Sequence, residues 1–478
     1  MESIWSNSCD IRKRESLKSD INVDVAVIGA GMAGILIAYK LKQAGKDVIV
    51  IDANRIASGQ TRNTTAKITS QHGCIYNKLI SDFGIEKAKQ YARANQEAIE
   101  EYENIITNNN IDCDFERVDS YLYSIKDEKL MRTEAESAYS LGLPASFVTQ
   151  TSLPFSIAGA VKFKNQAQFN PIKFLNHISN DLKIYENISV STVEDNIIKA
   201  NDFTITANSI VFACHYPFIN FPGLYFSRMH QERSYVIAVD NAPQLNGMYI
   251  GIEDCGYSFR NYKDYLLIGG YSHRTGENSQ GGKYSQLRTA TKKLFPDCVE
   301  IANWSAQDCI TADGIPYIGQ YASSKPNWFV ATGFNKWGMT SSMVSANMIS
   351  NIICGKDTPY SEVFNPSRFP VSSIPKIMTE VAHAVKGLSK ENISIPKTIL
   401  DELPHGHGGI INVDGKKVGV YKTNDSKVYI VDTRCPHLGC QVEWNPDEKT
   451  WDCPCHGSRF DYTGKLINNP AQEGIEIE

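Results

Sequence analysis

The feature that most constrains the fold is a glycine-rich turn near the start of the chain. It follows the uninterrupted apolar run 23–28, which is typical of a buried parallel strand. A helix is expected next, ended by Gly45, and then a second buried strand over 47–52. Together these segments predict a βαβ unit. The glycines of the turn are Gly29, Gly31 and Gly34.

Each position of this turn has a physical role in binding a dinucleotide. Gly29 permits the tight turn, Gly31 lets a pyrophosphate approach the backbone, and Gly34 allows the helix to pack closely on the strand. The phosphates would meet the amide groups at the helix N-terminus. Asp52 lies 18 residues beyond Gly34, where a carboxylate accepts hydrogen bonds from a ribose diol and repels a 2′-phosphate. The motif disfavours NADP but does not separate FAD from NAD.

Length and charge narrow the functional classes. With 478 residues the chain is expected to form about three domains, or two with one large. Its formal charge of −5 gives no broad attraction to nucleic acid or to an anionic membrane. The longest uncharged apolar run, 25–39, is short of the roughly 20 residues that a membrane-spanning helix needs. We therefore expect no transmembrane segment and a cytoplasmic protein, in which isolated cysteines stay reduced.

The remaining pattern divides the chain into a large α/β unit and a small all-β unit. Short alternating strands over 234–271 predict an antiparallel sheet inserted into the α/β unit. Residues 364–375 hold three prolines and three serines, and short strands and turns dominate from residue 410 onward. The predicted divisions are an N-terminal polar segment 1–22, a large domain 23–370, a linker 371–402 and a small domain 403–478.

Two Cys–His loops lie in the small domain. The loops read Cys-Pro-His-Leu-Gly-Cys over 435–440 and Cys-Pro-Cys-His-Gly-Ser over 453–458. Thiolate and imidazole ligands suit both a [2Fe–2S] cluster and a structural zinc ion, so zinc is the alternative at this point.

The large domain resembles the D-amino-acid-oxidase-like family of FAD-dependent oxidoreductases. The matching stretches are SGQTRNTTAK at 58–67, VFACHYP at 211–217, TADGIPYIG at 311–319 and ATGFNKWGMTS at 331–341. The resemblance implies non-covalent FAD. Beyond the glycine turn and Asp52, it implies FAD contacts from Ser58, Thr61, Thr64, Thr65, Lys67, Val193, Gly333, Phe334, Trp337, Gly338, Met339 and Thr340.

The substrate residues remain open. Amino-acid-oxidising relatives clamp the substrate carboxylate with an arginine shortly before the 311–319 stretch, where this chain has Gln307 and Asp308. Arg260 could substitute, but an arginine in such a sheet is more typical of a surface or edge position. His72 and His215 could face the flavin or be bonded to backbone partners. No catalytic residue is identified.

The small domain, 403–478, resembles the Rieske [2Fe–2S] family. The resemblance implies that Cys435 and Cys453 bind one iron and that His437 and His456 bind the other. It further implies a disulfide between Cys440 and Cys455, which would be unusual in a reducing cytosol. It places the exit for electrons at an exposed cluster edge formed by the two histidines.

Two further positions bear on the reduction potential of the cluster. Ser458 matches a hydroxyl that hydrogen-bonds a bridging sulfur in high-potential relatives, whereas Phe460 stands where those relatives carry tyrosine. We expect a potential below the top of the roughly −150 to +300 mV Rieske range.

The sequence thus predicts a Rossmann-like FAD domain with an inserted antiparallel substrate sheet, followed by a small all-β Rieske domain. A hydride from a small amine or amino-acid-like substrate would reduce FAD, and electrons would pass singly through the cluster to an acceptor protein or quinone. Because the chain has only one dinucleotide motif, NADH is not expected as the donor. The alternatives are a redox sensor or electron carrier without small-molecule turnover, and an oxygenase, for which no two-histidine, one-carboxylate site is evident.

Overall fold

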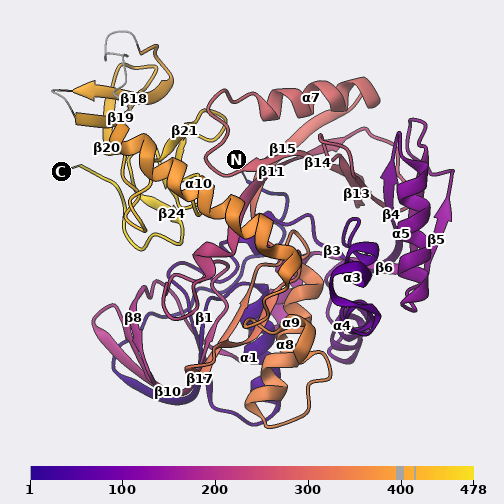
Figure 1. Ribbon diagram of the computed structural model, residues 1–478, viewed down its shortest axis with the longest axis horizontal. Coiled ribbons are helices and arrows are strands. Elements are labelled where there is room, and N and C mark those ends of the chain that lie inside the picture. Colours follow the sequence, from indigo (N-terminus) through magenta and orange to yellow (C-terminus); the bar gives the residue numbers. More distant parts are fainter. Residues whose placement is uncertain (1, 394–402, 414–415, 478) are drawn as a thin grey trace.

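The computed structural model describes residues 2–393, 403–413 and 416–477. We call residues 2–370 the N-terminal unit and residues 403–477 the C-terminal unit. Helix α10 (Ile374–Ile393) lies between them, and in Figure 1 it runs diagonally from the N-terminal unit to the C-terminal strands. Helix α10 occupies most of the predicted linker, and residues 394–402 of that linker lie outside the described residues.

The first sheet of the N-terminal unit carries the predicted βαβ unit. Its strand order is β16-β17-β10-β1-β2-β7, with β1, β2, β7, β10 and β17 parallel and the β8–β9 hairpin beside β10. The last four residues of β1 are all buried, because both faces of this central parallel strand are covered. Val25 and Val27 pack in the core that contains the helices, whereas Ala26 and Ile28 pack in a second core with the β8–β9 hairpin. The strands are β1 (Ile21–Ile28), β2 (Val48–Ile51), β7 (Lys183–Tyr185), β8 (Val190–Glu194), β9 (Ile197–Ala200), β10 (Phe203–Phe212), β16 (Tyr317–Ala322) and β17 (Lys325–Thr332).

The second sheet contains the antiparallel strands predicted over 234–271. Its order is β15-β11-β14-β13-β12-β4-β6-β3, with β5 beside β6. The strands are β3 (Lys67–Ile68), β4 (Glu116–Ser124), β5 (Ala145–Val148), β6 (Gly159–Gln168), β11 (Met229–Asp240), β12 (Met248–Gly251), β13 (Ser258–Tyr262), β14 (Tyr265–Arg274) and β15 (Val299–Thr311).

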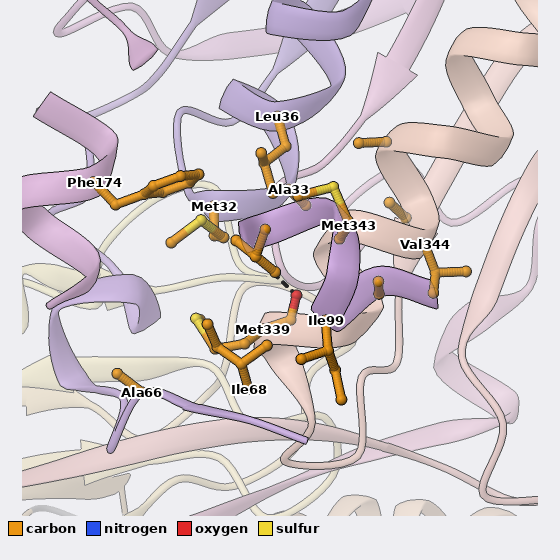
Figure 2. Close-up of a cluster of buried hydrophobic side chains, with 14 of the residues drawn as sticks. Met32, Ala33, Leu36, Ala66, Ile68, Ile99, Phe174, Met339, Met343 and Val344 are labelled. Atoms are coloured by element: carbon orange, nitrogen blue, oxygen red, sulfur yellow. Dashed lines mark hydrogen bonds between the residues drawn. The ribbon is translucent and has the colours of Figure 1, made fainter. Parts of the chain in front are cut away.

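Helices pack around and between these sheets. Figure 2 shows the core between α1, which begins at the predicted dinucleotide-binding turn, and α8, which begins in the 331–341 stretch of the resemblance. Met32 and Leu36 of α1 lie there with Met339 and Met343 of α8. The helices are α1 (Met32–Gln43), α2 (Gln60–Asn63), α3 (Tyr76–Phe83), α4 (Ile85–Asn108), α5 (Glu128–Ser140), α6 (Pro171–Ile178), α7 (Lys283–Leu294), α8 (Gly338–Ile353) and α9 (Ser361–Phe364). Short 3₁₀ turns lie at η1 (Tyr225–Ser227) and η2 (Val371–Ser373).

The polar N-terminal segment is part of the packed unit. Trp5 is fully buried, and its indole Nε1 donates a 2.7 Å hydrogen bond to the carbonyl of Thr64. Ile11 and Leu17 are also buried. The segment therefore packs directly on residues that follow the second strand.

The C-terminal unit consists of two small antiparallel sheets, of order β18-β19-β20 and β21-β22-β23-β24. Its core includes Trp451 and Phe460, both fully buried. The strands are β18 (His407–Val413), β19 (Lys416–Lys422), β20 (Val428–Asp432), β21 (Glu443–Asn445), β22 (Thr450–Asp452), β23 (Arg459–Asp461) and β24 (Leu466–Asn468). Within the described ranges, no helix combines the length and apolar character needed to cross a membrane.

Candidate functional site

The glycine turn has no room for side chains at two of its three positions. A Cβ on Gly29 would lie 2.4 Å from the carbonyl oxygen of Ala213, and its φ of +112° also favours glycine. A Cβ on Gly34 would lie 1.8 Å from the carbonyl oxygen of Gly29. Gly31 is the N-cap of α1 and makes no side-chain cap. The first turn of α1 therefore presents backbone amides beside β1, as a phosphate-binding helix requires.

Two side chains complete this turn. Asp52 follows β2, and its carboxylate accepts hydrogen bonds from the amides of Ala30 at 2.7 Å and Asn54 at 2.8 Å. Burial raises the pKa of Asp52, although these two bonds oppose the shift. Thr61, on α2, accepts a 2.9 Å bond from the amide of Met32 in the first turn of α1. The structure thus brings Gly31, Asp52 and Thr61 together at the start of α1.

A second helix N-terminus lies beside the segment that follows Thr61. Trp337 is the N-cap of α8, and its ring stacks on His72 with centroids 4.8 Å apart. The Thr340 hydroxyl donates to the carbonyl of Thr69 at 3.2 Å. The start of α8 and the segment up to His72 therefore form one packed group, which contains Trp337 and Thr340 of the FAD contacts implied by the resemblance.

The other predicted FAD residues are distributed around this group. Thr64 Oγ1 accepts from the amide of Ala66 at 2.9 Å, and the Lys67 ammonium donates to Thr65 Oγ1 at 3.1 Å. Burial lowers the pKa of Lys67 to about 7. The remaining residues of the predicted set lie on the exposed loop before α2 (Ser58), on β8 (Val193), between β17 and α8 (Gly333, Phe334) and in the first turn of α8 (Gly338, Met339).

Arg260 is neither a surface nor an edge residue, so that expectation is wrong. It lies on β13, is 1 % exposed, and donates to the carbonyl oxygens of Ala66 at 2.8 Å and Phe169 at 3.2 Å. A further bond joins it to the carbonyl of Thr65. Because side chains alternate along a strand, the side chain of Arg260 points into the interior. There, backbone carbonyls accept the hydrogen bonds that water would accept at the surface. Arg260 therefore stabilises the backbone immediately before β3.

The two histidines left open by the sequence differ in their partners. His72 bonds the Tyr91 hydroxyl through Nδ1 and the carbonyl of Thr69 through Nε2, both at 2.7 Å. Burial lowers the pKa of His72 to about 3, so the ring is neutral. Nε2 of His215 is buried without a hydrogen-bond partner, and burial lowers the pKa of His215 to about 4.

The two Cys–His loops share one backbone geometry. In the first, the carbonyl of Cys435 accepts from the amide of Gly439 at 2.9 Å, and in the second the carbonyl of Cys453 accepts from Gly457 at 3.0 Å. Both glycines have positive φ, +81° and +84°, which favours glycine at the end of each loop. The repeated geometry directs two cysteines and two histidines toward one point between the loops.

The atoms facing that point suit an iron–sulfur cluster. Nδ1 of His437 and Nδ1 of His456 are both buried without a hydrogen-bond partner, and the ring centroids lie 4.9 Å apart. The thiols of Cys435 and Cys453 are each 1 % exposed and face one another. Orphaned nitrogens beside paired free thiols are the donors that a Rieske cluster uses.

Cys440 and Cys455 form a disulfide, as the resemblance implied. Their Cα atoms are 6.5 Å apart, and their sulfurs and that of Cys453 lie within 4.8 Å of one another. The disulfide joins the two loops across 15 residues of sequence, which contributes roughly 3 kcal/mol in the chain-entropy model. Gly387 of α10 packs on it, since a Cβ there would lie 2.5 Å from Cys455 Sγ.

Replacing Ser458 with alanine is expected to lower the potential of the cluster. Ser458 is fully buried, accepts a 3.0 Å bond from the amide of Ala471, and hydrogen-bonds the Cys435 sulfur. That bond stabilises the reduced, more negative cluster, so a loss of about 1.4 kcal/mol corresponds to about 59 mV for one electron. Protein-film voltammetry of Ser458→Ala beside Ser426→Ala, an exposed serine of the same unit, measures the shift. Equal potentials would contradict the role of the hydroxyl.

The N-terminal unit contacts the histidine edge of the loops, where His456 is buried and His437 is half-buried. The electron exit expected at this edge stays a prediction. His437 Nε2 lies 2.7 Å from Asn220 Oδ1. His456 is 3 % exposed, and its ring meets Phe226 edge-on at 5.9 Å. Gln231 Nε2 donates to the carbonyl of His456 at 2.7 Å.

An ion network closes the same interface. Arg233 of β11 binds both carboxylate oxygens of Glu448, with Nε 3.0 Å from Oε2, and Arg459 binds the same carboxylate at 3.1 Å. Burial alone would raise the pKa of Glu448, but the two guanidinium groups hold it at about 2. Arg274 donates a hydrogen bond to the carbonyl of Pro454 and forms an ion pair with Glu380 of α10. Sequence reasoning missed these residues, because they belong to no short motif.

Comparison with known proteins follows this division of the chain. Residues 24–352 match the family model of the FAD dependent oxidoreductases, and residues 398–477 match that of the Rieske [2Fe-2S] domain. The chain is 35 % identical to the putative Rieske 2Fe-2S iron-sulfur protein YhfW of Bacillus subtilis (strain 168), over 98 % of this chain and 96 % of that protein. It is also 35 % identical to the cytochrome b6-f complex iron-sulfur subunit of Synechococcus elongatus, over 18 % of this chain and 49 % of that subunit.

Solved structures share the fold of the N-terminal unit. L-proline dehydrogenase from P. horikoshii is similar with a TM-score of 0.61 at 18 % identity, covering 73 % of this chain and 98 % of that one. Glycine oxidase from Geobacillus kaustophilus gives 0.61 at 17 % identity, covering 73 % and 99 %. This chain therefore belongs to the FAD dependent oxidoreductase family and carries a C-terminal Rieske domain, which makes it an oxidoreductase with FAD and a [2Fe–2S] cluster.

Proposed function

We propose that the protein oxidises a small amine or amino-acid-like substrate and passes the electrons singly through the cluster to an external acceptor, a redox protein or a quinone. The observation that carries this proposal is the direct docking of the C-terminal unit on the N-terminal unit. Asn220 and Gln231 contact the cluster loops, and Arg233 contacts Glu448 beside them. Two redox sites held together in one chain favour electron transfer between them.

The cofactor contacts follow from the arrangement of the site. We assign the pyrophosphate to the first turn of α1 and the pyrimidine end of the flavin to the first turn of α8, where backbone amides favour negative charge. When bound, FAD supplies two-electron chemistry by accepting a hydride. We assign the cluster, which supplies one-electron chemistry, to Cys435, His437, Cys453 and His456.

The charges of the substrate sheet support an amine at the reacting end. Asp308 lies in the segment where amino-acid-oxidising relatives carry the arginine that clamps the substrate. It is the cross-strand neighbour of Glu232, whose carboxylate lies 2.7 Å from Lys336 Nζ. Trp304, four residues earlier on the same face of β15, bonds the carbonyl of Asn63 at 2.9 Å, so this face lies toward the FAD site. Burial raises the pKa of Asp308 to about 6. An acidic pair attracts an ammonium group and opposes binding of a carboxylate.

The electron count fixes the acceptor stoichiometry. Oxidation of an amine to an imine removes one hydride from carbon, which carries two electrons, and releases one proton to water. Because the cluster holds one electron at a time, two equivalents of a one-electron acceptor are reduced per substrate. A quinone would accept both electrons in successive steps.

An anaerobic substrate screen tests the proposal. Amines, amino acids and N-alkylated amino acids are added to the holoprotein while flavin bleaching is followed optically and the reduced cluster by electron paramagnetic resonance (EPR). We expect one class of compound to bleach the flavin and then to produce the cluster signal. If no compound bleaches the flavin but a reduced carrier protein does, the protein is an electron carrier or sensor instead.

A further inference from the structure

The ring of His437 has a defined orientation between the two units. Its Nδ1 faces the other ligand loop and has no hydrogen-bond partner, while its Nε2 lies 2.7 Å from the side-chain oxygen of Asn220. The Nε2–H therefore donates to Asn220, which leaves the lone pair on Nδ1 for iron. Asn220 belongs to the N-terminal unit, so a residue 217 positions away orients this ligand.

Three further side chains contact the histidine edge or its loops. Phe226 covers the rings, and Gln231 donates to the carbonyl of His456 at 2.7 Å. Gln307 of β15 donates to Gln231 at 2.6 Å and to the carbonyl of Gly457 at 2.8 Å. Each of these side chains is buried or half-buried, and all of these bonds except the one between the two glutamines join one unit to the other.

The stretch 213–231, which contains Asn220, Phe226 and Gln231, begins beside the dinucleotide turn. Ala213 follows β10, its amide donates to the carbonyl of Ile28 at 2.8 Å, and its carbonyl lies against Gly29. Asn469 of the C-terminal unit bonds the carbonyls of Cys214 at 3.0 Å and Tyr216 at 2.7 Å. Residues 213–231 thus contact the FAD site at one end and the C-terminal unit, including its cluster loops, at several positions along their length.

We propose that Asn220 and Gln231 are positioning residues that hold the histidine edge of the cluster against the N-terminal unit, so that electrons pass from flavin to cluster in this docked state without movement of the C-terminal unit. The inference rests on the proposed function. In each transfer one electron leaves the reduced flavin and converts one ferric ion of the cluster to ferrous. No bond to the cluster forms or breaks, and the proton released by the flavin goes to water. The external one-electron acceptor then reoxidises the cluster.

Flash photoreduction separates docked transfer from transfer by a mobile domain. The anaerobic holoprotein is illuminated with EDTA as the electron donor, so that the flavin is reduced first, and the cluster signal is followed in time. In the native chain we expect a rate constant that is independent of protein concentration and of glycerol viscosity. A domain that must move to its partner would slow with viscosity.

Variants of the two positioning residues provide the second part of the test. Asn220→Ala and Gln231→Ala are each expected to slow the transfer by on the order of tenfold and to make it sensitive to viscosity. Asn220→Asp, which keeps the acceptor oxygen, is expected to retain a viscosity-independent rate. Asn246→Ala, at an exposed turn of the second sheet, is the matched control. FAD content and the histidine nitrogen couplings of the reduced cluster, measured by electron–nuclear double resonance, establish that each variant is folded and loaded.

The outcomes distinguish this inference from the proposed function. If the flavin never reduces the cluster in the native protein, the proposed function fails. If transfer occurs but slows with viscosity in the native chain, or is unchanged in both alanine variants, the docked-state inference fails. Loss of the Asn220 bond is also expected to change the nitrogen coupling of His437, and an unchanged coupling would remove Asn220 from the positioning role.

Discussion

A Cys453→Ser variant is expected to lose the iron–sulfur cluster completely and to keep its FAD. Cys453 is 1 % exposed and faces Cys435 between the ligand loops, outside the disulfide. A serine hydroxyl does not replace a soft thiolate as an iron ligand, and the buried space has no other sulfur donor, since Cys440 and Cys455 are bonded to one another. Iron and acid-labile sulfide analysis, with EPR of the dithionite-reduced protein, measures the loss.

The same variant divides the proposed reaction into its two steps. Substrate should still bleach the flavin, because the FAD site lies in the other unit, while reduction of a one-electron acceptor should fall to background. Cys354→Ser, at the half-buried C-cap of α8, is the control and should keep both steps. A full cluster signal in Cys453→Ser would contradict the ligand assignment.

An Arg233→Ala variant is expected to have the largest effect on stability. The side chains of Arg233 and Glu448 are 2 % and 7 % exposed, and removing one partner leaves a buried carboxylate short of its counter-ion. Breaking a buried pair in this way typically costs about 3–5 kcal/mol. For a domain the size of the C-terminal unit this lowers the melting temperature by roughly ten degrees or more, which calorimetry of the holoprotein measures.

A more exposed pair, between α7 and β15, provides the control. Arg288 binds Glu300 through two bonds of 2.7 and 2.8 Å, but their side chains are 46 % and 25 % exposed. Such pairs contribute about 1 kcal/mol or less, so Arg288→Ala should change the melting temperature little. If both variants melt alike, the Arg233–Glu448 pair does not anchor the interface.

The sign of the pH dependence follows from the depressed pKa of Glu448. Its value of about 2 in the folded protein is below the usual value near 4.3. The stability that this group contributes is therefore present above about pH 4.3 and is lost as the pH falls toward 2. Neutral and mildly acidic buffers should leave the two units docked.

The sequence was most informative where chemistry requires fixed spacing. The glycine turn, Asp52 and the two Cys–His loops each lie within a short stretch, so their geometry follows from local sequence, and the structure brings each set together. The alternating strands over 234–271 likewise predicted the second sheet. These elements share one property: their partners are either close in sequence or repeated along it.

The docking of the two units could not be predicted from local sequence. Asn220 and His437 are 217 residues apart, and Arg233 and Glu448 are 215 apart, with no pattern that relates them. Arg260 was misplaced for a related reason, because only the folded sheet shows that backbone carbonyls receive its guanidinium. The contact of the N-terminal unit with the histidine edge was not foreseen either, because nothing in the local sequence indicates it.

The docked histidine edge also bears on the biogenesis of the protein. In the docked chain Cys435 and Cys453 are each 1 % exposed, Phe226 and Gln231 contact His456, and the disulfide lies against α10, whereas His437 is only half-buried. Docking therefore narrows the approach of iron and sulfide from solvent to the side of His437. We expect the cluster to be inserted faster while the C-terminal unit is undocked, so that docking follows insertion during maturation.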